Sequence, residues 1–276
     1  MAFLPTLQGL LQSAGIHINA QSFLLLFFLI FARLIAALSL APFMGGQALP
    51  SQAKVGLAAV IAALLYPGLA EAAGTIPGSS MLYFALLAKE FVVGMMIGFI
   101  SQMIFFGVQT AGIVIDTQRG LNQITYLAPQ LPGNVSALGN LQVQVSIVLF
   151  LLLGGHLLFL RSIAHSFLVI PLLQVPHFGS GWLPLANEFT RISASAILVG
   201  AQLCAPVVLT IFLVDISFGS IQKVASSIRI SNDSNIAKSW IGLAVFLLSA
   251  GFFFDRLQQF LASVIPTIDH FVASMR

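Results

Sequence analysis

Long apolar runs separated by short polar segments dominate the chain. A helix that spans a bilayer needs about 20 mostly apolar residues. Six runs approach that length: residues 23–43, 55–70, 91–115, 143–160, 192–214 and 240–254. A shorter apolar piece, residues 162–173, is expected to form half a helix. The pattern predicts an all-α, polytopic membrane protein with about six hydrophobic helices.

Proline interrupts several of these runs, at Pro42, Pro67 and Pro206. A proline inside a helix removes a backbone hydrogen bond and kinks the helix, and lipid does not tolerate unpaired backbone groups. We therefore expect partly broken helices that form hairpins and pack into a larger assembly. Because no repeat or soluble segment is visible, we predict a single membrane domain over residues 1–276, with a polar loop at about 216–239.

The composition supports a membrane environment. The chain is 58% hydrophobic and 7% charged, whereas soluble domains carry about 25% charged residues. The net charge of +3 is scattered along the sequence. No basic run could neutralise phosphates, so we expect no nucleic-acid partner.

Two local features concern processing and redox chemistry. Residues 1–21 contain no Lys or Arg, so they lack the positive start of a cleavable signal. The run at 23–43 is then expected to be a retained helix. The single cysteine, Cys204, lies in an apolar run and is expected to be a small buried hydrophobe.

The positive charges do not decide the orientation of a six-span chain. Short cytoplasmic loops normally carry an excess of Lys and Arg. Here one side would hold Lys54, Arg119, Lys223, Arg229 and Lys238, and the other Lys89, Arg161, Arg191, Arg256 and Arg276. The totals are equal, although the three cations of residues 216–239 favour a cytoplasmic position for that loop. The tie indicates that the chain is not a simple six-span bundle.

Four charged residues fall inside or at the ends of apolar runs: Arg33, Lys89, Glu90 and Asp215. A charge at bilayer depth usually faces a partner or a cavity. Arg33 can form an ion pair or a carbonyl contact inside the protein, or it can line a polar path. Lys89 and Glu90 are neighbours, so we expect them to point about 100° apart, with Lys89 reaching toward the interface.

Two further segments have both an ordinary interpretation and a functional one. Gly94 and Gly98 form a G-x-x-x-G face, which favours close contact between two helices in lipid but is common in apolar helices. Residues 109–132 run from an apolar helix into a polar loop that begins at Asp116 and contains Arg119. This loop can be a plain surface connection, or it can line or block a polar pore.

Motifs for covalent chemistry are absent from the sequence. It contains no H-E-x-x-H, no G-x-S-x-G and no nucleotide-binding loop of the Walker type. The five histidines are widely spread, and no carboxylate lies near His156 and His165 to orient a histidine base. We therefore expect no enzymatic activity, no cofactor and no metal.

Several motifs in order resemble the FliR/SctT (YscT, SpaR) family of flagellar and type III secretion export-apparatus membrane proteins. The most specific are Glu90-x3-Gly94-x3-Gly98 and Gln109-x2-Gly112-x3-Asp116-x-Gln118-Arg119-Gly120. Further matching positions are Arg33, Pro42, Pro50, Lys54, Gly154, Gly155, His156, Ser166, Pro171, Asp215, Gly219, Lys223 and Lys238. The resemblance covers most of the chain, roughly residues 33–238.

The resemblance implies roles for individual residues. Its plug loop, which closes the export pore, maps onto Asp116, Gln118, Arg119, Gly120, Leu121, Asn122 and Gln123, and continues less specifically to Pro132. The resemblance assigns helix packing to Glu90, Gly94, Gly98 and Gly112. The remaining charges within the membrane or its loops are Arg33, Asp215, Lys223 and Lys238.

The resemblance also implies a function and partners. The chain would be a non-enzymatic subunit of an export gate in the bacterial inner membrane, joined in a helical ring by SctR/FliP-like and SctS/FliQ-like subunits. SctU/FlhB-like and SctV/FlhA-like export proteins would act beside it, and unfolded secreted proteins would pass through. The other interpretation of the charges is a small-molecule or ion transporter, in which Arg33 and Asp215 bind the substrate or protons.

The sequence departs from the family pattern at two places. Residues 226–229 stand where the family often has a Pro-Gln-x-Asn stretch, and Ala128 replaces an Asp that is common after the plug segment. The Asp-x-Gln-Arg-Gly motif at 116–120 resembles the secretion-system branch more than the flagellar branch.

Overall fold

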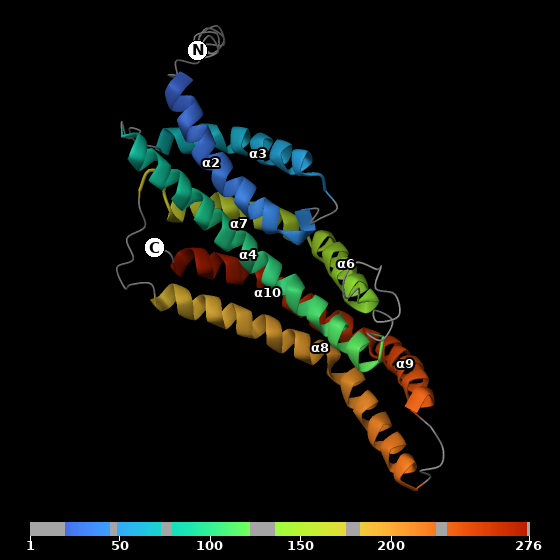
Figure 1. The fold of residues 1–276 in the computed structure, drawn as a ribbon. Helices are drawn as coiled ribbons and strands as arrows, with labels where there is room; N and C mark the ends of the chain where they lie inside the picture. The colour runs from blue at the N-terminus through green and yellow to red at the C-terminus, as the bar shows by residue number, and fades with distance from the viewer. Residues whose placement is uncertain are drawn as a thin grey trace. The chain divides into compact units, whose positions relative to one another are not determined.

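The computed structural model describes residues 20–44, 49–72, 79–121, 136–174, 183–224 and 231–274. Within these ranges the chain consists of α-helices and one short 3-10 helix, with no strand, which confirms the all-α prediction (Figure 1). The elements are α2 (Ala20–Leu40), η1 (Pro42–Met44), α3 (Ser51–Ala72), α4 (Ser80–Gln118), α6 (Ala137–Leu152), α7 (Gly155–Val169), α8 (Leu183–Val224), α9 (Ser231–Leu248) and α10 (Ala250–Ser274).

Four helices of the described part are long and apolar enough to cross a membrane: α2, α3, α4 and α8. Two bent pairs, α6 with α7 and α9 with α10, reach that length only together, which gives up to six spans. The number of spans expected from the sequence thus agrees with the upper count, and four of the six predicted runs are single helices.

The two remaining runs are divided where no break was predicted. The run at 143–160 is interrupted at Leu153 and Gly154, and Gly154 has a φ of +72°, a conformation that favours glycine. The piece at 162–173, expected as half a helix, is the second half of α7 followed by a turn. The run at 240–254 is interrupted at Ser249, whose hydroxyl donates to the carbonyl oxygen of Phe246.

Two of the three prolines inside apolar runs, Pro67 and Pro206, lie within continuous helices. α3 continues past Pro67 and α8 past Pro206. A proline removes one backbone bond at a cost of about 3 kcal/mol, whereas a helix that ends in an apolar environment leaves several backbone groups unpaired, each at a cost of several kcal/mol. Pro42 follows the helix end at Leu40, and Pro171 follows the end of α7 at Val169.

The expected polar loop at 216–239 is largely helical. α8 extends to Val224 and α9 begins at Ser231. Residues 226–229, where the sequence departs from the family pattern, lie outside the described residues, as does Ala128.

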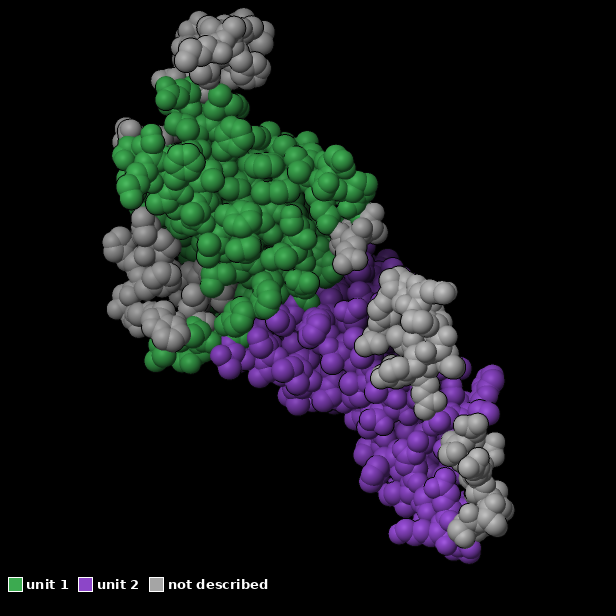
Figure 2. Space-filling view, in the orientation of Figure 1, with its two compact units in different colours: residues 1–102, 156–189, 265–276 green, residues 103–155, 190–264 purple. Residues whose placement is uncertain are grey.

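The chain divides into two compact units, coloured separately in Figure 2. Unit 1 comprises residues 1–102, 156–189 and 265–276, and unit 2 comprises residues 103–155 and 190–264. In unit 1, α2 packs against α3 and supplies fully buried apolar side chains such as Leu29 and Leu34. In unit 2, Ile115 and Ile211 are fully buried. Each unit contains one of the two polar clusters described next.

Candidate functional site

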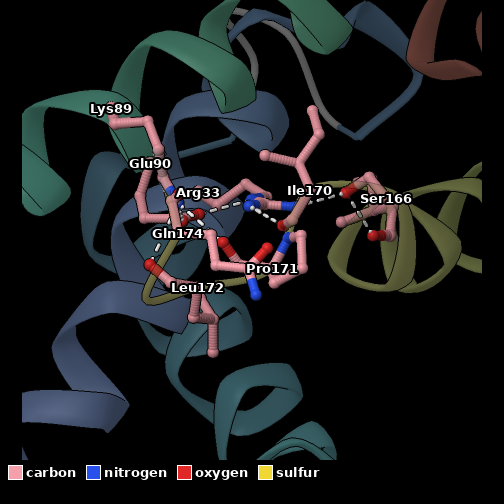
Figure 3. A network of polar contacts seen from close by, with 9 residues as sticks. Arg33, Lys89, Glu90, Ser166, Ile170, Pro171, Leu172 and Gln174 are labelled. Atoms are coloured by element: carbon pink, nitrogen blue, oxygen red, sulfur yellow. Dashed lines mark hydrogen bonds and ion pairs between the residues drawn. The ribbon is translucent and has the colours of Figure 1, made fainter. Parts of the chain in front are cut away.

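A buried ion pair lies at the centre of unit 1 (Figure 3). Arg33, in the middle of α2, donates from Nε to Oε2 of Glu90 on α4 at 2.5 Å, and both side chains are fully buried. The guanidinium also donates from Nη1 to the hydroxyl of Ser166 at 3.0 Å and from Nη2 to the carbonyl oxygen of Ile170 at 2.9 Å. It lies 4.1 Å from the ring centre of Phe167. Arg33 therefore joins α2, α4 and the end of α7.

Lys89 belongs to the same cluster, contrary to the expectation that it points away from Glu90. Its Nζ lies 2.6 Å from Oε1 of Glu90, an ion pair without hydrogen-bond geometry. The same ammonium donates to the carbonyl oxygens of Pro171, Leu172 and Gln174 at 2.9–3.0 Å. These three residues follow the end of α7 at Val169, and the flexible four-carbon side chain of Lys89 reaches their carbonyl oxygens.

Close packing of glycines brings Glu90 to Arg33. A Cβ atom on Gly94 would overlap the carbonyl oxygen of Arg33, and one on Gly98 would lie 2.7 Å from the carbonyl oxygen of Ala37. Residues four apart share a helix face, so Glu90, Gly94 and Gly98 all lie on the face of α4 toward α2. The structure thus places the G-x-x-x-G pair in a close contact between these two helices.

A second polar cluster, in unit 2, lies at both ends of segment 122–135. Asp116, near the end of α4, accepts at Oδ2 from the hydroxyl of Ser136 at 2.8 Å and from the backbone N–H of Leu138 at 2.9 Å. Its backbone carbonyl accepts from the N–H of Leu121 at 3.1 Å. Ser136 in turn caps α6 by accepting from the N–H of Gly139. One carboxylate therefore joins the residues before and after this segment.

Arg119 connects the same carboxylate to α9. Its Nη1 lies 3.3 Å from Oδ1 of Asp116, and its Nε donates to the carbonyl oxygen of Ser239 at 3.1 Å. Gly242 lies against its alkyl chain, where an added Cβ would be 2.8 Å from Cγ. We call Asp116, Arg119, Ser136 and Ser239 the clasp.

The other predicted residues are divided around these two clusters. Gly112 packs on Gly139 beside the clasp, and Gly120 has a φ of +79° at its edge. Gln118 is exposed at the last residue of α4. Asp215 and Lys238 form an ion pair between α8 and α9, and Lys223 is exposed in the last turn of α8. Asn122 and Gln123 lie outside the described residues.

Sequence reasoning missed two residues of the clasp. Ser136 carries a usable signal, because a serine directly before an apolar helix is a favoured N-cap. Ser239 carries none, because its carbonyl oxygen is the main acceptor for Arg119 and a backbone atom leaves no trace in the residue type. Within the described ranges, no group of three or more His, Cys, Asp or Glu side chains is placed to hold a metal ion.

Comparisons with known proteins extend over most of the chain. The sequence profile of "Bacterial export proteins, family 1" matches residues 24–264. The chain is 27% identical to the flagellar biosynthetic protein FliR of Escherichia coli (strain K12), over 76% of this chain and 78% of that protein. It is 28% identical to the Yop proteins translocation protein T of Yersinia pestis, over 75% and 78%. It is 26% identical to the surface presentation of antigens protein SpaR of Shigella flexneri, over 87% and 91%.

Proposed function

Because the chain belongs to the bacterial export proteins, family 1, we propose that it is a non-enzymatic core subunit of the export gate. The chain is a multi-pass inner-membrane protein of the flagellar or type III secretion export apparatus. It forms the channel for unfolded secreted proteins together with SctR/FliP-like and SctS/FliQ-like subunits, beside SctU/FlhB-like and SctV/FlhA-like proteins. The resemblance found in its motifs is confirmed. Flagellar and secretion-system relatives are equally similar, at 27% and 28% identity, so the secretion branch stays a prediction.

The observation that carries the proposal is the clasp. A plug must fill a pore in the resting state and yet stay attached to a fixed base. The Oδ2 atom of Asp116 accepts hydrogen bonds from Ser136 and Leu138. The segment between Asp116 and Ser136 therefore begins and ends at the same carboxylate. Arg119, 8% exposed, fixes that point to α9. These contacts support the proposal that 116–132 contains a plug, attached through Asp116 and Arg119 to α6 and α9.

The contacts of the charged residues argue against a solute transporter. Arg33 is fully buried and donates to three partners inside unit 1. Asp215 is paired with Lys238. Arg33 has no surface that a solute could reach, and the charge of Asp215, whose side chain is 43% exposed, is already matched by Lys238. Liposomes that contain this chain alone are therefore expected to show no solute flux above empty liposomes.

Gene deletion and co-purification test membership in a gate. Deletion is expected to abolish secretion, and the tagged chain is expected to co-purify with its ring partners. Intact secretion in the deletion strain, or a chain that purifies alone from cells expressing the partners, contradicts the proposal.

A separate experiment tests the plug. Arg119→Ala combined with a shortened 118–123 segment is expected to make the assembled channel leaky to ions, measured as conductance in a planar bilayer. Arg256→Ala is the matched control, because Arg256 is an exposed arginine of α10 that contacts Gln259 on its own helix. An assembled variant as tight as the parent would show that 116–132 is not a plug.

A further inference from the structure

A pocket in unit 1 contains charges that serve neither the Arg33 cluster nor the clasp. It has a volume of about 270 Å³ and is lined by Leu158, Arg161, Ser162, His165 and Asp269. The first four residues come from α7 and Asp269 comes from α10. Sites for whole small molecules begin at roughly 300 Å³, so this pocket fits a headgroup rather than an entire ligand.

The charges that line the pocket have no partner within the described residues. Arg161, His165 and Asp269 take part in no ion pair or hydrogen bond there. A guanidinium within 4 Å of the carboxylate would form an ion pair, so the pocket keeps the cationic wall and the acidic wall apart. Unpaired charges in membrane proteins are costly and mark functional positions. The separation suits a ligand that carries both signs of charge.

The face of α7 around the pocket combines an arginine and a histidine with exposed apolar side chains. Leu158, Arg161, His165 and Leu168 are all exposed, and their spacing of three, four and three residues places them along one helical stripe. Leucines therefore lie at both ends of the stripe, with Arg161 and His165 between them. Leu158, which also lines the pocket, thus offers an apolar surface next to Arg161, as a phospholipid needs for acyl chains beside its charged phosphate.

We propose that the pocket between Arg161, His165 and Asp269 binds a zwitterionic phospholipid headgroup that carries a phosphate and a primary ammonium, as in phosphatidylethanolamine. Arg161 donates to the phosphate as a planar fork, with His165 and the Ser162 hydroxyl beside it. Asp269 accepts from the ammonium on the opposite wall. The acyl chains lie along Leu158, the apolar residue of the pocket lining. A tightly bound lipid at this position would anchor α7 in the membrane.

Lipid titrations of the full-length chain, followed by native mass spectrometry, test this site. The probes are phosphatidylethanolamine, phosphatidylglycerol and phosphatidylcholine with identical acyl chains, and inorganic phosphate. We expect phosphatidylethanolamine to bind most tightly, because phosphatidylglycerol has no ammonium and the quaternary ammonium of phosphatidylcholine has no N–H to donate. Inorganic phosphate is expected to bind weakly, since it reaches only one wall of the pocket.

Substitutions separate the two walls. Arg161→Gln is expected to weaken binding of all three lipids about tenfold. Asp269→Asn is expected to weaken only phosphatidylethanolamine, to the level of phosphatidylglycerol. Arg256→Gln and Asp255→Asn, which change exposed charges of α10 outside the pocket, are matched controls and should leave binding unchanged.

Four results would overturn the proposal. They are equal binding of all lipids, unchanged binding in Arg161→Gln, tight binding of inorganic phosphate, or an equal loss in the two control variants.

A second experiment distinguishes lipid from a protein that occupies the same pocket. In the assembled complex, a photo-cross-linker at Leu158 should capture lipid, and capture of a partner subunit instead would assign the pocket to that subunit.

Discussion

At the scale of single residues, the Arg33 cluster makes a buried charge tolerable. An arginine at bilayer depth costs at least about 2.5 kcal/mol. Here Glu90 supplies the opposite charge, and the guanidinium also meets a hydroxyl, a carbonyl and an aromatic face. The second cation, Lys89, meets the carbonyl oxygens that follow α7, where a helix end carries partial negative charge. The surplus positive charge of the cluster is thus balanced by backbone.

This balance predicts the effect of breaking the pair. Arg33→Leu leaves Glu90 buried with only Lys89 as a partner, so we expect the free energy of unfolding to fall by about 3 kcal/mol. The double variant Arg33→Leu/Glu90→Leu removes both charges and should be more stable than Arg33→Leu alone. Thermal unfolding of the detergent-solubilised chain measures both. Equal destabilisation in the two variants would show that the ion pair is not the source of the loss.

Arg33→Lys tests the geometry of the cluster apart from its charge. Lysine keeps the positive charge but lacks the planar fork that reaches three different partners, so Ser166 and the carbonyl oxygen of Ile170 lose their donor. We expect a loss of about 1–3 kcal/mol, chiefly from the carbonyl oxygen of Ile170, because the Ser166 hydroxyl still donates to Ile163. The same unfolding assay measures it. A variant as stable as the parent would show that charge alone holds α2, α4 and α7 together.

At the scale of elements, the contact between α2 and α4 depends on the absence of two side chains. Gly94→Ala places a Cβ against the backbone of Arg33, so the helices must separate. We expect a loss of about 1–3 kcal/mol, typical of overpacking, and poorer assembly. The matched control is Gly56→Ala in α3, because nothing lies within 4 Å of its added Cβ. In the isolated chain it should stabilise by up to about 1 kcal/mol through helix propensity. If Gly94→Ala is as stable as the parent, the contact between α2 and α4 does not depend on the missing side chain of Gly94.

The elements also show how far the sequence could predict the structure. Apolar length identified α2, α3, α4 and α8, because length and hydropathy are local properties. The helix breaks at Gly154 and Ser249 were not predicted, because glycine and serine also occur inside continuous helices. The partners of Arg33 could not be predicted either. Glu90 lies 57 residues away in the chain, and no local pattern says which carboxylate meets which guanidinium.

Among the site residues, too, local geometry could be predicted and contacts between distant segments could not. The spacing of Glu90, Gly94 and Gly98 placed three residues on one face, which follows from helix geometry alone. The prediction that Lys89 and Glu90 point apart was wrong. The direction of their Cβ atoms does not fix where two long side chains end. Lys89 turns to the carbonyl oxygens of Pro171 and Leu172, which are within reach because α7 ends just before them.

At the scale of the whole molecule, burial is uneven among the long helices. Within their most apolar windows, α4 is 56% buried, whereas α8 is 28% buried and α3 is 17% buried. Lipid could cover the exposed faces, but an export gate predicts that neighbouring subunits do. Packing between helices in membranes requires complementary protein surfaces. The exposed faces of α3 and α8 are therefore where the chain should meet its partners.

Photo-cross-linking tests this assignment in the assembled complex. Leu64 on α3 and Phe212 on α8 are 75% and 60% exposed, so a photoreactive residue at either position should form an adduct with another export-apparatus polypeptide. Leu29 is the control, because it is fully buried within the chain and should react only internally. If both exposed positions capture lipid alone while the complex is intact, lipid covers these faces. The assignment of the exposed faces of α3 and α8 as contacts with partner subunits would then be wrong.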